Sequence, residues 1–243
     1  MEINNPNYDY NNVIQINDTD ASRKFLANVF MWMFAALGVS ALCAYMFANT
    51  PSLLLTLVDV TTGQLTAFAY IAMFSPLAFV LLMRFGLNKI SYPILSLLFI
   101  VYAALTGISL SFILLIYTSA SVMGVFLTSS VVFGIMAIAG YTTKTDLTKF
   151  GSILIMFLVG IVVATIVNMF LRSTGLDMII SYIGVAVFVG LTAYDVQKLK
   201  QIGAGLTYGD ASASKMALMG GLTLYLDFIN LFLFLLRLFG RRR

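Results

Sequence analysis

The sequence predicts an all-α membrane protein with seven transmembrane helices, the last of which lies at the centre of the bundle. Hydrophobic residues make up 60% of the 243-residue chain and charged residues 10%, whereas soluble proteins are about half apolar and about a quarter charged. Seven runs almost free of charge are each long enough to cross about 30 Å of hydrocarbon. These runs cover residues 25–48, 64–83, 91–117, 121–141, 150–171, 178–197 and 215–238.

The segment before the first run is polar. Residues 1–22 are rich in Asn and Asp, and they lack the basic stretch that begins a secretory signal peptide. We therefore expect a flexible polar tail at 1–22, followed by a single seven-helix domain at 23–243. The first run then serves as an uncleaved membrane anchor.

The basic residues of the short connections predict the orientation. If the N-terminus is cytoplasmic, the inner segments carry nearly all of the Lys and Arg, and the outer loops before the last run contain only Arg172. Cytoplasmic loops are enriched in basic residues, so we expect a cytoplasmic N-terminus. The inner set is Arg23, Lys24, Arg84, Lys89, Lys144, Lys149, Lys198, Lys200 and Lys215.

The end of the chain conflicts with this pattern. Arg237 and Arg241–Arg243 lie outside if the last run crosses fully, and inside if that run bends back. We expect the full crossing, because the run at 215–238 is long enough to span the membrane.

Missing residue types exclude several chemistries. The chain has no His and one Cys, which excludes Ser-His-Asp catalysis, HExxH zinc sites and an intramolecular disulfide. Cys43 lies inside the first run, as is typical of a small core residue. The net charge of +4 is spread over short loops, unlike the charge of a nucleic-acid-binding protein. We expect no enzyme, no tightly bound cofactor and no nucleic-acid partner.

Two acidic residues, Asp195 and Asp227, fall clearly within apolar runs. A charge near the bilayer centre costs about 2.5–3.5 kcal/mol on insertion scales, so such residues face the bundle interior or water and mark functional sites. On the last run Asp227 belongs to a single polar stripe, and the other faces are Leu and Phe. That pattern predicts a helix in the middle of the bundle. The stripe consists of Gly220, Thr223, Asp227 and Asn230.

Asp195 has two interpretations. Thr192 precedes it by one helical turn and Lys198 follows it by one turn, so Asp195 can form an ordinary ion pair at the membrane boundary. It can also meet Asp227, because the last two runs are consecutive and antiparallel. Two carboxyl groups in contact do not easily ionise together and take up protons as a unit, which makes such a pair a sensor of pH.

Arg84 is the third candidate. It ends the second run on the inner side, at the depth expected for Asp195. Pro76 lies two turns earlier, where it removes a helix hydrogen bond and acts as a hinge. Arg84 can therefore bind a carboxylate and swing away when that carboxylate is protonated, or it can extend its side chain to lipid phosphate.

Three segments carry a family resemblance. They are GISLSFILLIYTSASVMGVFLTSSVVFGIMAIAGYTTKTDLTKFGS (107–152), ISYIGVAVFVGLTAYDVQKLK (180–200) and GGLTLYLDFINLFLFLLRLFG (220–240). They resemble the Bax inhibitor-1 family, most of all its bacterial branch, and the pieces AYDVQK and LYLDFINLF are the specific ones. The Gly-Pro that many eukaryotic members have in the third span is missing, and the basic tail is reduced to three arginines. We therefore do not expect a role in cell death.

The resemblance implies both a fold and an activity. It implies seven helices with the last one surrounded by the other six, and a pH-dependent calcium leak with paired aspartates as proton sensor. The aspartates match Asp195 and Asp227, and the arginine latch of the second span matches Arg84 by position. The bacterial character implies the inner (cell) membrane, with the lipid bilayer, Ca²⁺ and protons as partners.

Calcium is compatible with this chemistry as a permeant ion. It takes several oxygen ligands, and the two carboxylates with water and three further side chains can form a weak metal site. Weak binding suits a leak, because the ion must leave again. The three supporting side chains are Thr192, Thr223 and Asn230.

Two alternatives stay open. One is a non-conducting regulator that binds other membrane proteins, such as a membrane protease. The other is an intramembrane aspartyl protease, whose catalytic aspartates also come from consecutive helices and include a Tyr-Asp pair like Tyr194-Asp195. That class also carries Gly-x-Gly-Asp and Pro-Ala-Leu segments, and both are absent from this sequence.

Overall fold

Helices make up almost all of the described chain. The computed structural model describes residues 18–59, 61–206 and 211–243. Within these residues, seven helices are long and apolar enough to cross a membrane, which confirms the predicted number. The helices are α1 (Asp18–Asn49), α2 (Pro51–Leu57), α3 (Ala67–Gly86), α4 (Tyr92–Ile116), α5 (Ser119–Thr142), α6 (Thr148–Leu171), α7 (Thr174–Ala204) and α8 (Ala211–Phe239).

Two helices extend beyond their apolar runs. α1 already includes residues 18–22, which the sequence assigned to the polar tail, whereas residues 1–17 of that tail lie outside the described residues. α7 continues to Ala204, into the loop predicted between the last two runs, and residues 207–210 of that loop are not described either. The two extensions pack together: the Ser22 hydroxyl donates to the Lys200 carbonyl at 2.9 Å. This long-range contact explains why hydropathy alone begins α1 too late and ends α7 too early.

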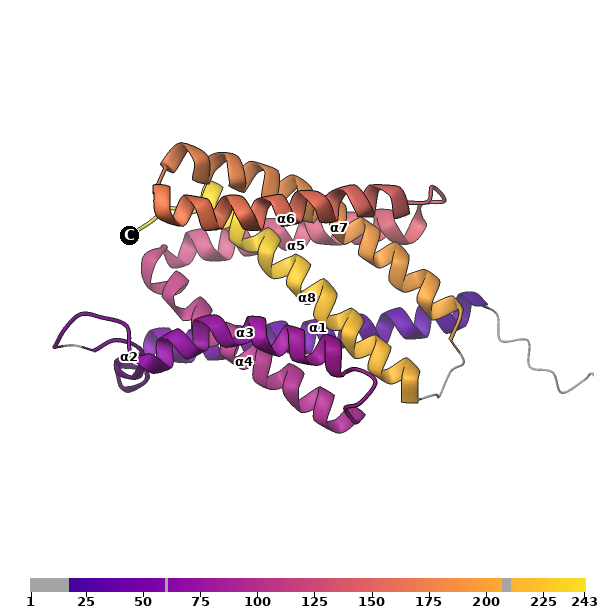
Figure 1. Ribbon diagram of the computed structural model, residues 1–243, viewed down its shortest axis with the longest axis horizontal. Coiled ribbons are helices and arrows are strands. Elements are labelled where there is room, and N and C mark those ends of the chain that lie inside the picture. The colour runs from indigo at the N-terminus through magenta and orange to yellow at the C-terminus, as the bar shows by residue number, and fades with distance from the viewer. Residues whose placement is uncertain (1–17, 60, 207–210) are drawn as a thin grey trace, which may run out of the picture.

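The helices form two groups with α8 between them (Figure 1). α1, α3 and α4 lie on one side, α5, α6 and α7 lie on the other, and α8 crosses diagonally from one group to the other. α8 packs directly against α1, α4, α5 and α7. α3 and α6 do not pack closely against it, so four of the other six spanning helices form its immediate surroundings.

Burial confirms that α8 is the central helix. Of its most apolar stretch, 61% is buried, against 11–44% for the other six spanning helices. Close approach depends on small residues: a Cβ added to Gly220 would collide with Leu199 and Val29, and one added to Gly221 would collide with Trp32. Membrane helices commonly use such small residues at their contacts.

The two described ends of the chain lie at opposite ends of the bundle (Figure 1). α1 begins where α7 ends, and α8 runs the full length to the far end. There the last residues pair with the α4–α5 turn, since the Thr118 amide donates to the Arg241 carbonyl at 3.0 Å and the Arg243 amide to the Ile116 carbonyl at 2.9 Å. α8 therefore runs from one end of the bundle to the other and does not bend back.

The α5–α6 connection is fastened to α7 by one side chain. Gln197 accepts a hydrogen bond from the Leu147 amide at 2.8 Å and donates one to the Thr145 carbonyl at 2.8 Å. Near it, Lys200 donates to the Tyr141 carbonyl at 2.8 Å. These bonds fix the end of α7 that carries Asp195.

Candidate functional site

A polar cleft lies beside α8. It faces α3 and α6, the two spanning helices that do not pack closely against α8. Its volume is about 640 Å³, and α3, α6, α7 and α8 supply its walls. Leu, Ile, Val and Phe side chains form much of the lining. The polar and charged lining residues are Arg84, Thr165, Tyr194, Asp195, Lys198, Thr223, Asp227, Asn230 and Arg237.

Asp227 lies on the floor of this cleft and is almost fully buried. Its residue is 4% exposed, and its Oδ2 atom has no hydrogen-bond partner. Leaving a buried polar atom without a partner is unfavourable by about 1–3 kcal/mol, and by more for a charged group. An unpaired carboxyl oxygen at the centre of a transmembrane bundle therefore points to a role other than structural hydrogen bonding.

Asp195 faces Asp227 from α7. The two carboxyl groups lie within hydrogen-bond reach of one another, so that a proton on either one can bridge them. Asp195 is half-buried, whereas Asp227 is buried. The pair predicted from the sequence is thus in contact, with Asp227 as the less accessible member.

Arg84 enters the cleft from the end of α3. It is close enough for its positive charge to act on both carboxyl groups. It nevertheless forms no ion pair within 4.0 Å with either of them, and its side chain is exposed. The arginine stands beside the pair without being bonded to it.

Lys198 does not neutralise Asp195 by direct contact. Its Nζ lies 5.7 Å from the centroid of the Tyr194 ring, over the ring face. No ion pair within 4.0 Å joins it to Asp195. The boundary ion pair that the sequence allowed is therefore not formed, although the charge of Lys198, one turn further along α7, still acts on Asp195.

The supporting polar residues divide into two sets. Thr223 and Asn230 line the cleft, and each donates to a carbonyl of its own helix, to Met219 at 3.1 Å and to Leu226 at 2.8 Å. Thr192 is fully buried, does not line the cleft and donates to the Phe188 carbonyl at 2.7 Å. Thr192 is thus a packing residue in this structure. The side-chain oxygen atoms of the cleft come from α8, from Asp195 and Tyr194 on α7, and from Thr165 on α6.

The α3 helix is only lightly packed near the site. Only Ala69, Ala72 and Met83 are buried in it. Pro76 lies inside the helix, as predicted, and the buried hydroxyl of the preceding Ser75 has no hydrogen-bond partner. A lightly packed helix with an internal Pro can move its end, and Arg84 lies at that end.

Asp177 and Arg237 form an ion pair near the Arg237 end of the cleft, and this pair was not predicted from the sequence. Arg237 Nη1 lies 3.1 Å from Asp177 Oδ1, and the guanidinium lies 5.4 Å from the centroid of the Phe234 ring. Asp177 and Arg237 are 60 residues apart. Because the last two helices are consecutive and antiparallel, the sequence could have predicted that Asp177, near the start of α7, lies close to Arg237, near the end of α8.

The site does not resemble a resident metal centre. Among the described residues, no group of three or more His, Cys, Asp or Glu side chains is placed to hold a metal ion. Two carboxylates with neighbouring hydroxyl, amide and water oxygens suit a hard cation that binds weakly and passes on.

These features define a helical membrane protein with a carboxyl pair inside its bundle, open to a polar cleft. A family model described as inhibitor of apoptosis-promoting Bax1 matches residues 22–243. The chain belongs to this family, which confirms the resemblance drawn from the three sequence segments.

Bacterial relatives cover nearly the whole chain. The chain is 44% identical over 220 residues to the inner membrane protein YbhL of Escherichia coli, covering 90% of this chain and 92% of the relative. It is 43% identical over 228 residues to a protein of Borreliella burgdorferi, covering 90% and 93%. A protein of Deinococcus radiodurans is 37% identical over 223 residues, covering 92% and 93%.

Proposed function

We propose that this protein is a pH-sensitive calcium leak channel of the bacterial inner membrane, with its N-terminus in the cytoplasm. The distribution of basic residues supports this orientation, and the name of the Escherichia coli relative, an inner membrane protein, supports the location. On this proposal, α1 begins at the inner end of the bundle and the arginines after α8 lie outside.

The observation that carries the proposal is the contact between Asp195 and Asp227 inside a transmembrane cleft. The pair offers oxygen ligands to a divalent cation inside a bundle whose other side chains are mostly apolar. It also binds protons as a unit, because two adjacent carboxylates in a poorly hydrated site repel each other. On this proposal, the same carboxyl pair serves both the ion pathway and the response to pH.

Arg84 acts as the latch. When at least one carboxyl group is ionised, its charge attracts the guanidinium and holds the end of α3 beside the cleft. When both are protonated, that attraction is lost and the lightly packed α3 is free to move outward, with Pro76 as the hinge. Calcium flux is therefore expected to rise as pH falls through the titration of the pair.

Reconstituted vesicles loaded with a calcium-sensitive dye test the proposal. For the wild type we expect faster calcium entry at about pH 6 than at about pH 8, because a more acidic medium protonates more of the carboxyl pairs. The double variant Asp195→Asn, Asp227→Asn has a permanently uncharged pair and should lose this pH dependence.

Asp59→Asn is the matched control, because Asp59 lies in the α2–α3 connection, away from the cleft. It should keep the wild-type response. Equal entry at both pH values in the wild type, with no effect of the double variant, would contradict the proposal.

Two other experimental outcomes would favour a different function. If the vesicles show no flux at any pH, a regulator that binds another membrane protein becomes the better explanation. The facing carboxyl pair also fits an aspartyl protease, whose chemistry needs one protonated and one ionised carboxyl group. Cleavage of a helical test substrate that is abolished by Asp227→Asn would favour that enzyme.

A further inference from the structure

A second cavity lies on a different face of α8 from the carboxyl pair. Phe228 and Ile229 line it, whereas Asp227 and Asn230 line the polar cleft. We propose that this cavity binds one acyl chain of an anionic phospholipid, and that the arginines after α8 hold the phosphate of its headgroup. This site is independent of the proposed calcium leak.

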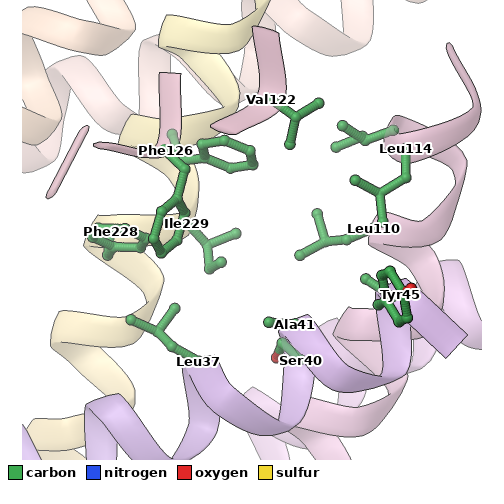
Figure 2. A pocket seen from close by; sticks show the side chains of 13 residues that line it. Leu37, Ser40, Ala41, Tyr45, Leu110, Leu114, Val122, Phe126, Phe228 and Ile229 are labelled. Atoms are coloured by element: carbon green, nitrogen blue, oxygen red, sulfur yellow. The ribbon is translucent and has the colours of Figure 1, made fainter. Parts of the chain in front are cut away.

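The cavity exists because α5 separates from the helices on either side of it. α1, α4 and α5 each pack against α8, but α5 makes no substantial contact with α1 or with α4. The wedge between them has α8 as its floor and a volume of about 330 Å³. Figure 2 shows Leu37, Ala41, Leu110, Val122 and Phe126 arranged around this open space.

The wedge continues along the bundle. A neighbouring cavity of about 630 Å³ between α1 and α5 shares Leu37, Ala41, Phe126 and Phe228 with it. Gly38 and Gly134 line this second part, and a Cβ added to either one would meet no atom within 4 Å. Together the two cavities form one long groove over α8, with the elongated shape of an extended hydrocarbon chain.

The lining selects an acyl chain as the occupant. Apart from the hydroxyls of Ser40, Tyr45 and Ser130, the groove presents only apolar side chains. Its rims reach the surface of the membrane-spanning helices, since Tyr45 is 65% exposed and Phe126 is 37% exposed. Lipid tails are what surround that surface in a bilayer, and an ion would find no adequate ligands along the groove.

The headgroup contacts come from the end of the chain. The backbone of Arg241 and Arg243 is bonded to the α4–α5 turn at Thr118 and Ile116. Leu114 and Val122, which line the groove, lie within about one helical turn of these bonds. The tail is thus attached directly beside one end of the groove.

The charge of this tail is not neutralised by carboxylates. Arg242 lies over the Tyr117 ring at 5.9 Å from its centroid, and Arg243 Nη2 donates to the Ser119 hydroxyl at 3.4 Å. Within the described residues, neither ion pair under 4.0 Å involves Arg241, Arg242 or Arg243. Three guanidinium groups at the membrane boundary attract an anionic phosphate, and each can bind it with paired hydrogen bonds.

Native mass spectrometry of the purified, delipidated protein tests the headgroup contact. The probes are phosphatidylglycerol and phosphatidylcholine with identical acyl chains. We expect one phosphatidylglycerol to bind with a preference of about tenfold or more, the effect of one to two juxtamembrane charges. The triple variant Arg241→Gln, Arg242→Gln, Arg243→Gln should lose the preference, while its backbone bonds to the turn are retained. Arg172→Gln, at the α6–α7 turn, is the matched control.

A second pair of variants tests the groove. Gly38→Leu with Gly134→Leu fills open space and should reduce binding of both lipids, whereas Gly160→Leu on α6, where a Cβ also meets nothing within 4 Å, should not. Circular dichroism verifies that each variant is folded. A phosphatidylglycerol preference that survives the triple variant, or full binding by the groove variant, would overturn the proposal. So would complete displacement by inorganic phosphate, because the tail would then be a general anion site.

Discussion

At the scale of single residues, one glycine decides how closely α5 and α7 approach. A Cβ on Gly140 would collide with the backbone of Ala193, two residues from Asp195. A backbone atom cannot move aside as a flexible side chain can. The sequence GLTAYD, which contains Ala193, is therefore positioned by a contact that only glycine permits, and Gly140 supports the site without touching it.

We predict that Gly140→Ala destabilises the protein by about 1–3 kcal/mol, the usual effect of overpacking. Helix propensity alone would favour the alanine by about 1 kcal/mol. The predicted loss of stability therefore comes from the collision with Ala193. Thermal unfolding in detergent provides the measurement.

Gly124→Ala is the control for this prediction, since it lies in the same helix and its added Cβ would meet nothing within 4 Å. It should unfold at the wild-type temperature or slightly above. Equal effects of the two substitutions would show that the contact between α5 and α7 does not limit stability.

At the scale of the helices, the beginning of α6 depends on a carboxylate. Asp146 Oδ1 accepts hydrogen bonds from the Thr148 amide at 2.9 Å and from the Thr148 hydroxyl at 2.6 Å. These bonds hold the pKa of Asp146 below its ordinary value. A carboxyl group whose pKa is lowered by folding stabilises the fold above its unfolded pKa, and this contribution is lost as pH falls through the folded pKa.

We therefore predict that the amides of the first turn of α6 lose protection from hydrogen exchange in acid, below about pH 4. Asp146→Ala should show the low protection at every pH. Asp59→Ala removes a similar carboxylate, which accepts hydrogen bonds from Thr61 in the α2–α3 connection. This substitution should leave α6 unchanged. Protection that is independent of pH in the wild type would contradict this account of Asp146.

Hydropathy predicted the spanning helices well because each run must cover the hydrocarbon thickness. It could not predict where α1 begins and where α7 ends, since these two helix ends are stabilised by a contact between Ser22 and Lys200. It also did not predict α2, a single short helix that begins with Pro51. The central place of α8 was predictable because only that helix combines a single polar stripe with large apolar side chains on its other faces.

At the scale of the whole molecule, the site joins parts of the chain that are far apart. Asp195 and Asp227 were found from the sequence because carboxylates are rare in apolar runs. The Asp177–Arg237 ion pair was not predicted, because neither residue lies deep in an apolar run. The α6 wall of the cleft was not predicted either, because α6 carries no charge after Lys149. Thr192 was assigned to the site by spacing, but its hydroxyl is used within α7.

The latch predicts a functional effect across the bundle. On the proposed mechanism, Arg84→Gln removes the charge that would hold α3 beside the carboxyl pair. Calcium entry at about pH 8 should then rise by up to about fivefold, the population shift expected from a partly exposed charge interaction. Dye-loaded vesicles give the measurement, with Arg172→Gln as the control. A fall in calcium entry at both pH values would mean instead that Arg84 is part of the ion pathway.

The central position of α8 has a consequence for biosynthesis. A chain is made from its N-terminus, so six spanning helices leave the ribosome before the one against which α1, α4, α5 and α7 pack. During that interval the apolar and glycine surfaces that will receive α8 have no partner from the same chain. Assembly of the bundle is thus completed only after α8 has been made, and a chain released before residue 211 lacks the helix against which α1, α4, α5 and α7 pack.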